Sequence, residues 1–145
     1  MKRVYLDSCI VIYLVEGSRE IRERIQQGLC AVCTDMSEVC VSPLTRMECR
    51  VLPLRKEDSA VLEKFAVFFN ESGVTFLDIT DRVFDVATTF RARKNLKVAD
   101  ALHLAAALEG GCTELWTNDK RLAQAAGNRI QIVVPIDRSG SGSAS

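Results

Sequence analysis

The segment from residue 98 to residue 109 places the strongest constraint on the fold. Its spacing predicts a helix that is apolar on nearly every face, so the rest of the protein must cover it on several sides. Asp100 lies in the first turn of this helix, and Asp119 follows a short apolar run further along the chain. A carboxylate beside a core is costly unless it is paired, so each acid needs a cap, a salt bridge or a cation.

Short apolar runs alternate with helical patterns along the chain. The runs that we predict to be strands are residues 3–6, 39–42, 74–77, 114–117 and 130–134. Predicted helices fill the intervals; the third is expected to end at Pro53, and the fourth to begin at Glu57. Strands separated by helices predict an α/β sandwich, with a central parallel sheet of four to five strands and helices on both faces.

The chain of 145 residues is long enough for one domain with its own core. We expect this single domain to span residues 1–138. The Gly/Ser-rich segment 139–145 is expected to be a flexible tail that lies outside the fold.

Charge and hydropathy limit the compartments and partners to consider. Lys and Arg number 19, as do Asp and Glu, so net charge does not indicate a nucleic acid or a membrane. The apolar run 9–15 is too short to cross a bilayer, and Asp7 interrupts what would be the apolar part of a signal peptide. These features predict a cytoplasmic protein without membrane contact. Its six cysteines are expected to be reduced thiols that pack as small hydrophobes, because Cys30 and Cys33 have no second pair at zinc spacing.

Four acidic residues are predicted to meet at one edge of the sheet. Asp7 follows the first predicted strand, Glu48 lies on the helix after the second, and Asp119 follows the fourth. Asp100 can join them from the helix that leads into the fourth strand. Ligand sites in such sheets lie beyond the carboxyl ends of the strands. Oxygen ligands without histidine or cysteine favour Mg²⁺ or Mn²⁺ over Zn²⁺, and a cation relieves the repulsion among the acids.

Each of these acids also has an ordinary structural interpretation. Asp7 and Asp119 can cap the helices that follow them. Glu48 can pair with the arginines of its own helix, and Asp100 can interact with the helix dipole. His103, one turn after Asp100, is expected to pack or to form hydrogen bonds rather than to act as a base.

Four motifs, in this order and spacing, resemble the PIN-domain family, and within it the VapC-type toxins of bacterial and archaeal toxin–antitoxin pairs. The motifs are YLDS (5–8), VSPLTRME (41–48), LKVADALHLAAAL (96–108) and TND (117–119). The resemblance implies a catalytic, metal-binding set of four acids with two polar supports. These residues are Asp7, Glu48, Asp100 and Asp119, with Ser8 and Thr117 as the supports.

The same resemblance implies a Mg²⁺- or Mn²⁺-dependent endoribonuclease that leaves 5′-phosphate and 3′-hydroxyl ends. It also implies two protein partners, an antitoxin that blocks the site and a second copy of the chain in a homodimer. The apolar stripes of the helices that start near Ser18 and Glu57 are candidate surfaces for these partners, unless the stripes belong to the core. Basic residues near the motifs are candidates for binding RNA phosphates. They are Arg46, Arg50, Arg91, Arg93, Lys94, Lys97, Lys120 and Arg121.

Two other functions stay open at this point. A receiver-like phosphoacceptor domain also places acids after parallel strands, but it needs paired acids after the first strand and a lysine after the last. The chain instead has Asp7-Ser8 and Pro135-Ile136-Asp137 at these places. A catalytically silent binding module on a PIN-like fold is the second alternative, and the presence of all four acids argues against it.

Overall fold

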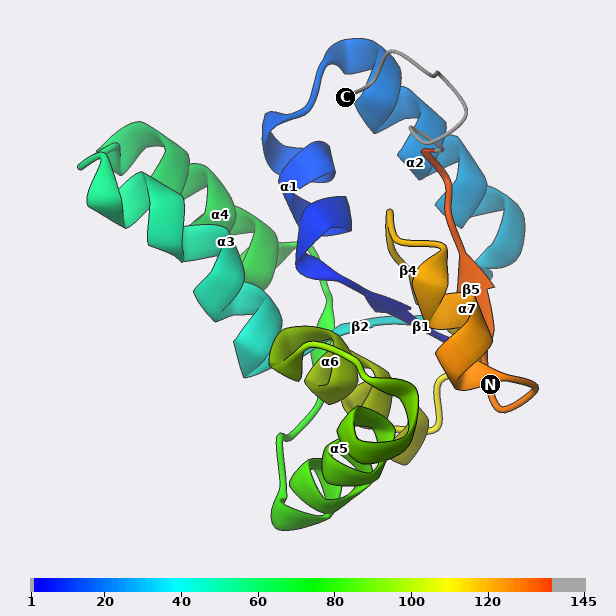
Figure 1. Ribbon diagram of the computed structural model, residues 1–145. Coiled ribbons are helices and arrows are strands. Elements are labelled where there is room, and N and C mark those ends of the chain that lie inside the picture. The colour runs from blue at the N-terminus through cyan, green and yellow to red at the C-terminus, as the bar shows by residue number, and fades with distance from the viewer. Residues whose placement is uncertain (1, 137–145) are drawn as a thin grey trace, which may run out of the picture.

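The computed structural model describes residues 2–136, which form a parallel five-stranded sheet between layers of helices (Figure 1). The strands are β1 (Arg3–Leu6), β2 (Glu38–Val41), β3 (Thr75–Phe76), β4 (Glu114–Trp116) and β5 (Gln131–Val133). Their order across the sheet is β3-β2-β1-β4-β5. The predicted α/β class with a parallel sheet is confirmed. The expected tail at residues 139–145 lies outside the described residues.

Seven helices connect or follow these strands within residues 2–136. They are α1 (Ser8–Glu16), α2 (Arg19–Val32), α3 (Pro43–Arg55), α4 (Ser59–Glu71), α5 (Asp81–Lys94), α6 (Val98–Glu109) and α7 (Arg121–Ala126). Side-chain caps at Ser18 and Thr80 begin α2 and α5, and Asn95 ends α5 in the left-handed conformation. None of the helices in this part of the chain is both long and apolar enough to cross a membrane.

Alternating strand residues pack into two cores, one on each face of the sheet. Tyr5 of β1, Cys40 of β2 and Leu115 of β4 belong to the core under α5, α6 and α7. Val4 and Leu6 of β1 belong to the other core, which α1, α2 and α4 cover. Figure 1 shows α5 and α6 on one side of the strands and α1 and α2 on the other.

Helix α6 is the buried helix that its sequence predicts, with the predicted bounds. Every residue from 101 to 107 is buried. Helix α5 packs along it, and the sheet lies beneath it. Helix α6 ends at Glu109, and the N–H of the next residue, Gly110, donates a hydrogen bond to the carbonyl of Ala106. This buried position brings one face of α6 to the carboxyl ends of the strands.

Two predicted helix boundaries are wrong. Helix α3 does not end at Pro53 but continues to Arg55. Proline removes one backbone hydrogen bond, and here it does so only in the last turn, where its ring is buried. Helix α4 does not begin at Glu57, because that residue adopts a left-handed φ of 53°, and Asp58 caps the helix instead.

The apolar stripes of α2 and α4 belong to the core. Ile25 of α2 and Phe65 and Phe69 of α4 are all buried under the same face of the sheet. They are therefore not free surfaces for an antitoxin or a second copy of the chain.

All six cysteines are free, as expected for reduced thiols. Cys40, Cys49 and Cys112 are buried and pack as small hydrophobes. Cys30 departs from this pattern because it is exposed on α2.

Candidate functional site

Asp7 is held at the carboxyl end of β1 through both of its carboxylate oxygens. Oδ1 accepts a hydrogen bond of 2.7 Å from the Ser8 backbone, and Oδ2 accepts one of 2.8 Å from the Thr117 hydroxyl. The Asp7 N–H donates to the carbonyl of Trp116 at 2.9 Å, which ties the turn to β4. The predicted helix cap is present, and the residue is buried. These contacts fix the orientation of the carboxylate.

The two predicted polar supports lie beside the acids. The buried Thr117 hydroxyl donates to Asp7 and accepts a hydrogen bond of 3.2 Å from the Asp119 N–H, so it links the turns after β1 and β4. The Ser8 hydroxyl lies 3.4 Å from Asp7 Oδ1. Hydrogen bonding by the Ser8 side chain also contributes to lowering the pKa of Glu48.

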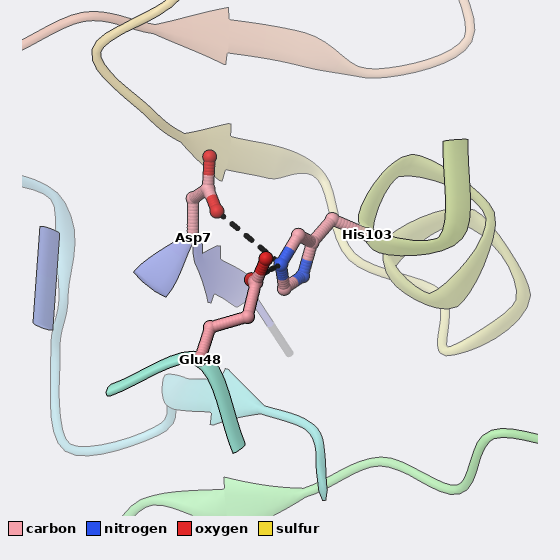
Figure 2. A group of neighbouring side chains, drawn as sticks. All are labelled: Asp7, Glu48 and His103. Carbon is pink, nitrogen blue, oxygen red and sulfur yellow. Dashed lines mark hydrogen bonds and ion pairs between the residues drawn. The ribbon is translucent and has the colours of Figure 1, made fainter. Parts of the chain in front are cut away.

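His103 of α6 lies between the carboxylates of Asp7 and Glu48 (Figure 2). Its Nε2 is 2.6 Å from Glu48 Oε1 and 3.3 Å from Asp7 Oδ1. Each of the three residues offers a possible metal ligand within 4.8 Å of the other two. The structure thus differs from the expected cluster without histidine. The only sequence signal was the one-turn spacing from Asp100, which puts His103 on a neighbouring part of the same helix surface.

Glu48 pairs with His103 rather than with an arginine of its own helix. Its side chain is 28% exposed, whereas that of His103 is 1% exposed. Burial acts to raise the pKa of Glu48, but the hydrogen bond and charge of His103 and the hydrogen bond from Ser8 outweigh it, and the pKa is lowered. Arg46 instead lies 5.1 Å from the centre of the Phe76 ring.

Asp100 and Asp119 line a pocket of about 820 Å³ next to this group. Burial, followed by the negative charges of Asp7 and Asp119, raises the pKa of Asp100 above its usual value. The acids after β1 and β4 and the acid of α6 therefore repel one another through space. The structure brings Asp7 and Glu48 together around His103, while Asp100 and Asp119 face the adjoining pocket.

Asp119 is paired with Arg121 inside its own turn. The guanidinium Nη2 is 2.7 Å from Oδ2, and Nε is 3.0 Å from Oδ1. Oδ1 also accepts a hydrogen bond of 2.9 Å from the Arg121 N–H, where α7 begins. These bonds hold the pKa of Asp119 below its usual value. A cation at Asp119 would compete with Arg121 for the same two oxygens.

Basic side chains surround the same pocket, and we call them the basic rim. Its members are Arg91, Arg93, Lys94, Lys97 and Arg121. They come from the end of α5, from the loop before α6 and from α7. Arg46 and Arg50 line a different pocket between α3 and α4. The first pocket therefore combines carboxylates with cations that suit a polyanion.

The donor set fits a divalent cation that prefers oxygen ligands. The carboxylates of Asp7 and Glu48 converge. Burial, followed by the negative charges of Asp7 and Asp119, raises the pKa of Asp100, and a cation would compensate those charges. Carboxylate oxygens suit Mg²⁺ and Mn²⁺.

Comparisons with known proteins find one matching family model and several solved structures of similar fold. The PIN domain family matches residues 4–128. The VapBC2 complex of Rickettsia felis bound to promoter DNA contains a chain with 14% identity and a TM-score of 0.71, with 90% of this chain and 97% of that chain covered. The sarcin-ricin loop cleaving toxin VapC20 of Mycobacterium tuberculosis has 17% identity and a TM-score of 0.69, with 92% and 98% covered.

DNA-bound VapBC from Salmonella typhimurium has 22% identity and a TM-score of 0.65, with 94% of this chain and 100% of that chain covered. At these identities the solved structures establish a common fold. No curated protein sequence matches the chain significantly.

Proposed function

The chain belongs to the PIN-domain family, and we propose that it is a metal-dependent endoribonuclease, the toxin of a toxin–antitoxin pair. The observation that carries the proposal is a single site in which the converging carboxylates of Asp7 and Glu48 adjoin a pocket with a basic rim. Solved proteins of this fold include a toxin that cleaves the sarcin-ricin loop and complexes named as toxin–antitoxin pairs. Membership of the family leaves the receiver-like alternative without support.

Asp7, Asp100 and Asp119 are the proposed ligands of Mg²⁺ or Mn²⁺, directly or through water. Glu48 is a further ligand or the residue that orients the attacking water. When bound, the cation would supply positive charge to the phosphate and lower the pKa of a water molecule. Asp7 is already fixed on both oxygens, so it needs little reorganisation to act. A nearby positive charge would favour the ionised form of Asp100, whose pKa is raised.

The basic rim is the proposed contact surface for phosphates that flank the cleaved bond. Its guanidinium and ammonium groups neutralise an anionic substrate that the carboxylates alone would repel. Attack by water, rather than by the ribose 2′-hydroxyl, leaves a 5′-phosphate and a 3′-hydroxyl. Cellular RNA as the substrate places the proposed activity in the cytoplasm.

Incubation of the purified protein with total cellular RNA tests the proposal. We expect cleavage with Mg²⁺ or Mn²⁺, and sequencing of the product ends should show 5′-phosphates and locate the cut. EDTA should abolish cleavage, as should Asp7→Asn in protein whose circular dichroism matches the wild type. Equal cleavage in EDTA would defeat the metal mechanism. Absence of cation binding at millimolar Mn²⁺ by calorimetry would favour a catalytically silent binding module.

An antitoxin and a second copy of the chain are the proposed protein partners. Light scattering on the purified chain should give twice the mass of one chain, and a monomer would rule out the homodimer. Addition of a cognate antitoxin should suppress RNA cleavage at a one-to-one ratio of the two proteins.

A further inference from the structure

His103 is the only histidine of the chain, and it is almost completely buried at the centre of the site. We propose that His103, held in place by Tyr5, positions the Glu48 carboxylate beside Asp7 for the reaction. The proposal rests on the proposed function and assigns His103 as a positioning residue that acts through Glu48.

The contacts define how the ring is held. Glu48 Oε1 lies 2.6 Å from Nε2, and an ionised carboxylate only accepts hydrogen bonds, so Nε2 must donate. Nδ1 lies 2.7 Å from the Tyr5 hydroxyl, and that hydroxyl lies 2.8 Å from the Ser42 hydroxyl. One chain of hydrogen bonds thus links Ser42, Tyr5, His103 and Glu48.

This chain of hydrogen bonds connects three elements that are distant in sequence. Tyr5 lies on β1, Ser42 precedes α3, and His103 lies on α6. All three residues are buried, so loss of any hydrogen bond leaves a polar group without water to replace it. The ring therefore has a defined orientation before any substrate or cation binds.

Glu48 needs such a partner because its side chain is long and partly exposed. A free glutamate samples several rotamers, and repulsion from Asp7 favours those that point to solvent. The Nε2–H group counters both effects, because it lies within reach of Glu48 Oε1 and of Asp7 Oδ1 at 3.3 Å. Figure 2 shows both carboxylates turned toward the same edge of the ring. Glu48 Oε2 is left to orient water or to approach a cation.

Two substitutions at residue 103 separate positioning from packing. His103→Gln keeps a donor, because its amide nitrogen is the same number of bonds from the backbone as Nε2. His103→Leu fills similar space and offers no donor. Tyr5→Phe removes only the hydroxyl that orients the ring, and it serves as the test if His103→Leu does not fold. The readouts are Mn²⁺ affinity by calorimetry, and kcat and KM on an RNA fragment that contains the cut site mapped in total RNA.

We expect His103→Leu to lower kcat and Mn²⁺ affinity by about 10- to 100-fold each, with KM for RNA nearly unchanged. His103→Gln should restore most of the loss, and Tyr5→Phe should show a smaller loss of the same kind. In the Glu48→Gln background, His103→Leu should have almost no further effect on kcat, because both changes act on one group.

Wild-type kcat and Mn²⁺ affinity in His103→Leu or Tyr5→Phe would overturn the proposal. If His103→Gln and His103→Leu lose kcat and Mn²⁺ affinity equally, and these losses follow a drop in melting temperature, His103 acts through packing alone. That result would also overturn the proposal. The proposal would also be overturned if the loss of kcat in the double variant equalled the product of the losses in Glu48→Gln and His103→Leu. If the wild-type protein cuts no RNA, the proposed function fails, while Mn²⁺ affinity still decides whether His103 positions Glu48.

Discussion

At the scale of single residues, the Asp100 carboxylate of the site lowers the stability of the folded protein, and the proposed binding of a cation explains why it is placed there. Burial of Asp100, followed by the negative charges of Asp7 and Asp119, acts against its ionised form and raises its pKa. Without a cation this arrangement destabilises the folded protein. Carboxylates that are gathered for binding or catalysis commonly lower the free energy of unfolding in this way.

Asp100→Asn should therefore stabilise the protein in EDTA while it removes activity. The folded-state pKa of Asp100 is raised, so the ionised group destabilises the fold at neutral pH, where both folded and unfolded chains are ionised. A partly exposed charge is worth at most about 1 kcal/mol, and we expect a melting temperature higher by roughly 1–4 °C. The gain should shrink as the pH falls through the raised pKa, since the wild-type carboxyl then becomes neutral.

Asp85→Asn is the matched control, because Asp85 is exposed on α5 away from the acids. Differential scanning calorimetry of both variants between pH 4 and pH 7 makes the comparison. A lower melting temperature for Asp100→Asn at pH 7 would contradict the argument that the ionised Asp100 carboxylate destabilises the folded protein.

Thr117→Val should destabilise the protein although it preserves the shape of the side chain. The buried hydroxyl bonds to Asp7 and to the Asp119 N–H, and its loss leaves two polar groups unsatisfied. We expect a cost of about 1–3 kcal/mol in the free energy of unfolding, measured by urea denaturation in EDTA. Thr113→Val is the control, because Thr113 is exposed and its hydroxyl donates a long hydrogen bond of 3.3 Å to the backbone carbonyl of Arg3. Equal stability of the two variants would refute the role of Thr117.

Sequence reasoning placed acids at the edge of the sheet but did not predict that His103 lies between Asp7 and Glu48. Asp7 and Asp119 could be placed because each follows a strand, and parallel strands end at the same edge. The contact of His103 with Tyr5 spans 98 positions and depends on how α6 docks on β1. No local pattern encodes that docking, so the imidazole between the acids could not be predicted.

At the scale of elements, boundaries were predictable where one local signal was decisive. Helix α6 matches its predicted bounds because its apolar pattern stops at Gly110. Strand β3 is shorter than predicted, because it lies at the edge of the sheet and pairs only with β2. Pro53 was misleading because a proline signal is local, whereas α3 is held through its last turn by packing against α4.

The burial of α6 gives a prediction at this scale. Leu104→Ala should destabilise the protein by about 3–5 kcal/mol, because Leu104 is fully buried and its loss leaves a cavity between α6 and the sheet. Leu52→Ala makes the same chemical change on α3, where the side chain is 52% exposed, and should cost no more than about 0.5 kcal/mol. Urea denaturation measures both values, and similar costs would show that α6 is not the central buried helix.

At the scale of the whole molecule, the net charge is zero, and positive charge is concentrated in one place. The 19 basic and 19 acidic residues cancel, so long-range attraction contributes little to RNA binding. The basic rim instead concentrates positive charge beside Asp100 and Asp119. Arg91 and Arg121 of this rim also have structural partners, Leu96 O and Asp119. Arg93 and Lys94 are therefore the better test of phosphate binding.

Replacement of Arg93 and Lys94 by alanine should weaken RNA binding and reduce its salt dependence. Each lost contact with a single-stranded phosphate lowers the slope of log affinity against log salt by about 0.7, so we expect a change of about 1.4 for two contacts. Fluorescence anisotropy with a labelled single-stranded RNA, in the inactive Asp100→Asn background, measures the slope between 50 and 200 mM KCl. Arg22→Ala with Arg24→Ala is the control, because α2 covers the other face of the sheet. A slope reduced equally by both pairs would mean that RNA does not enter through the basic rim.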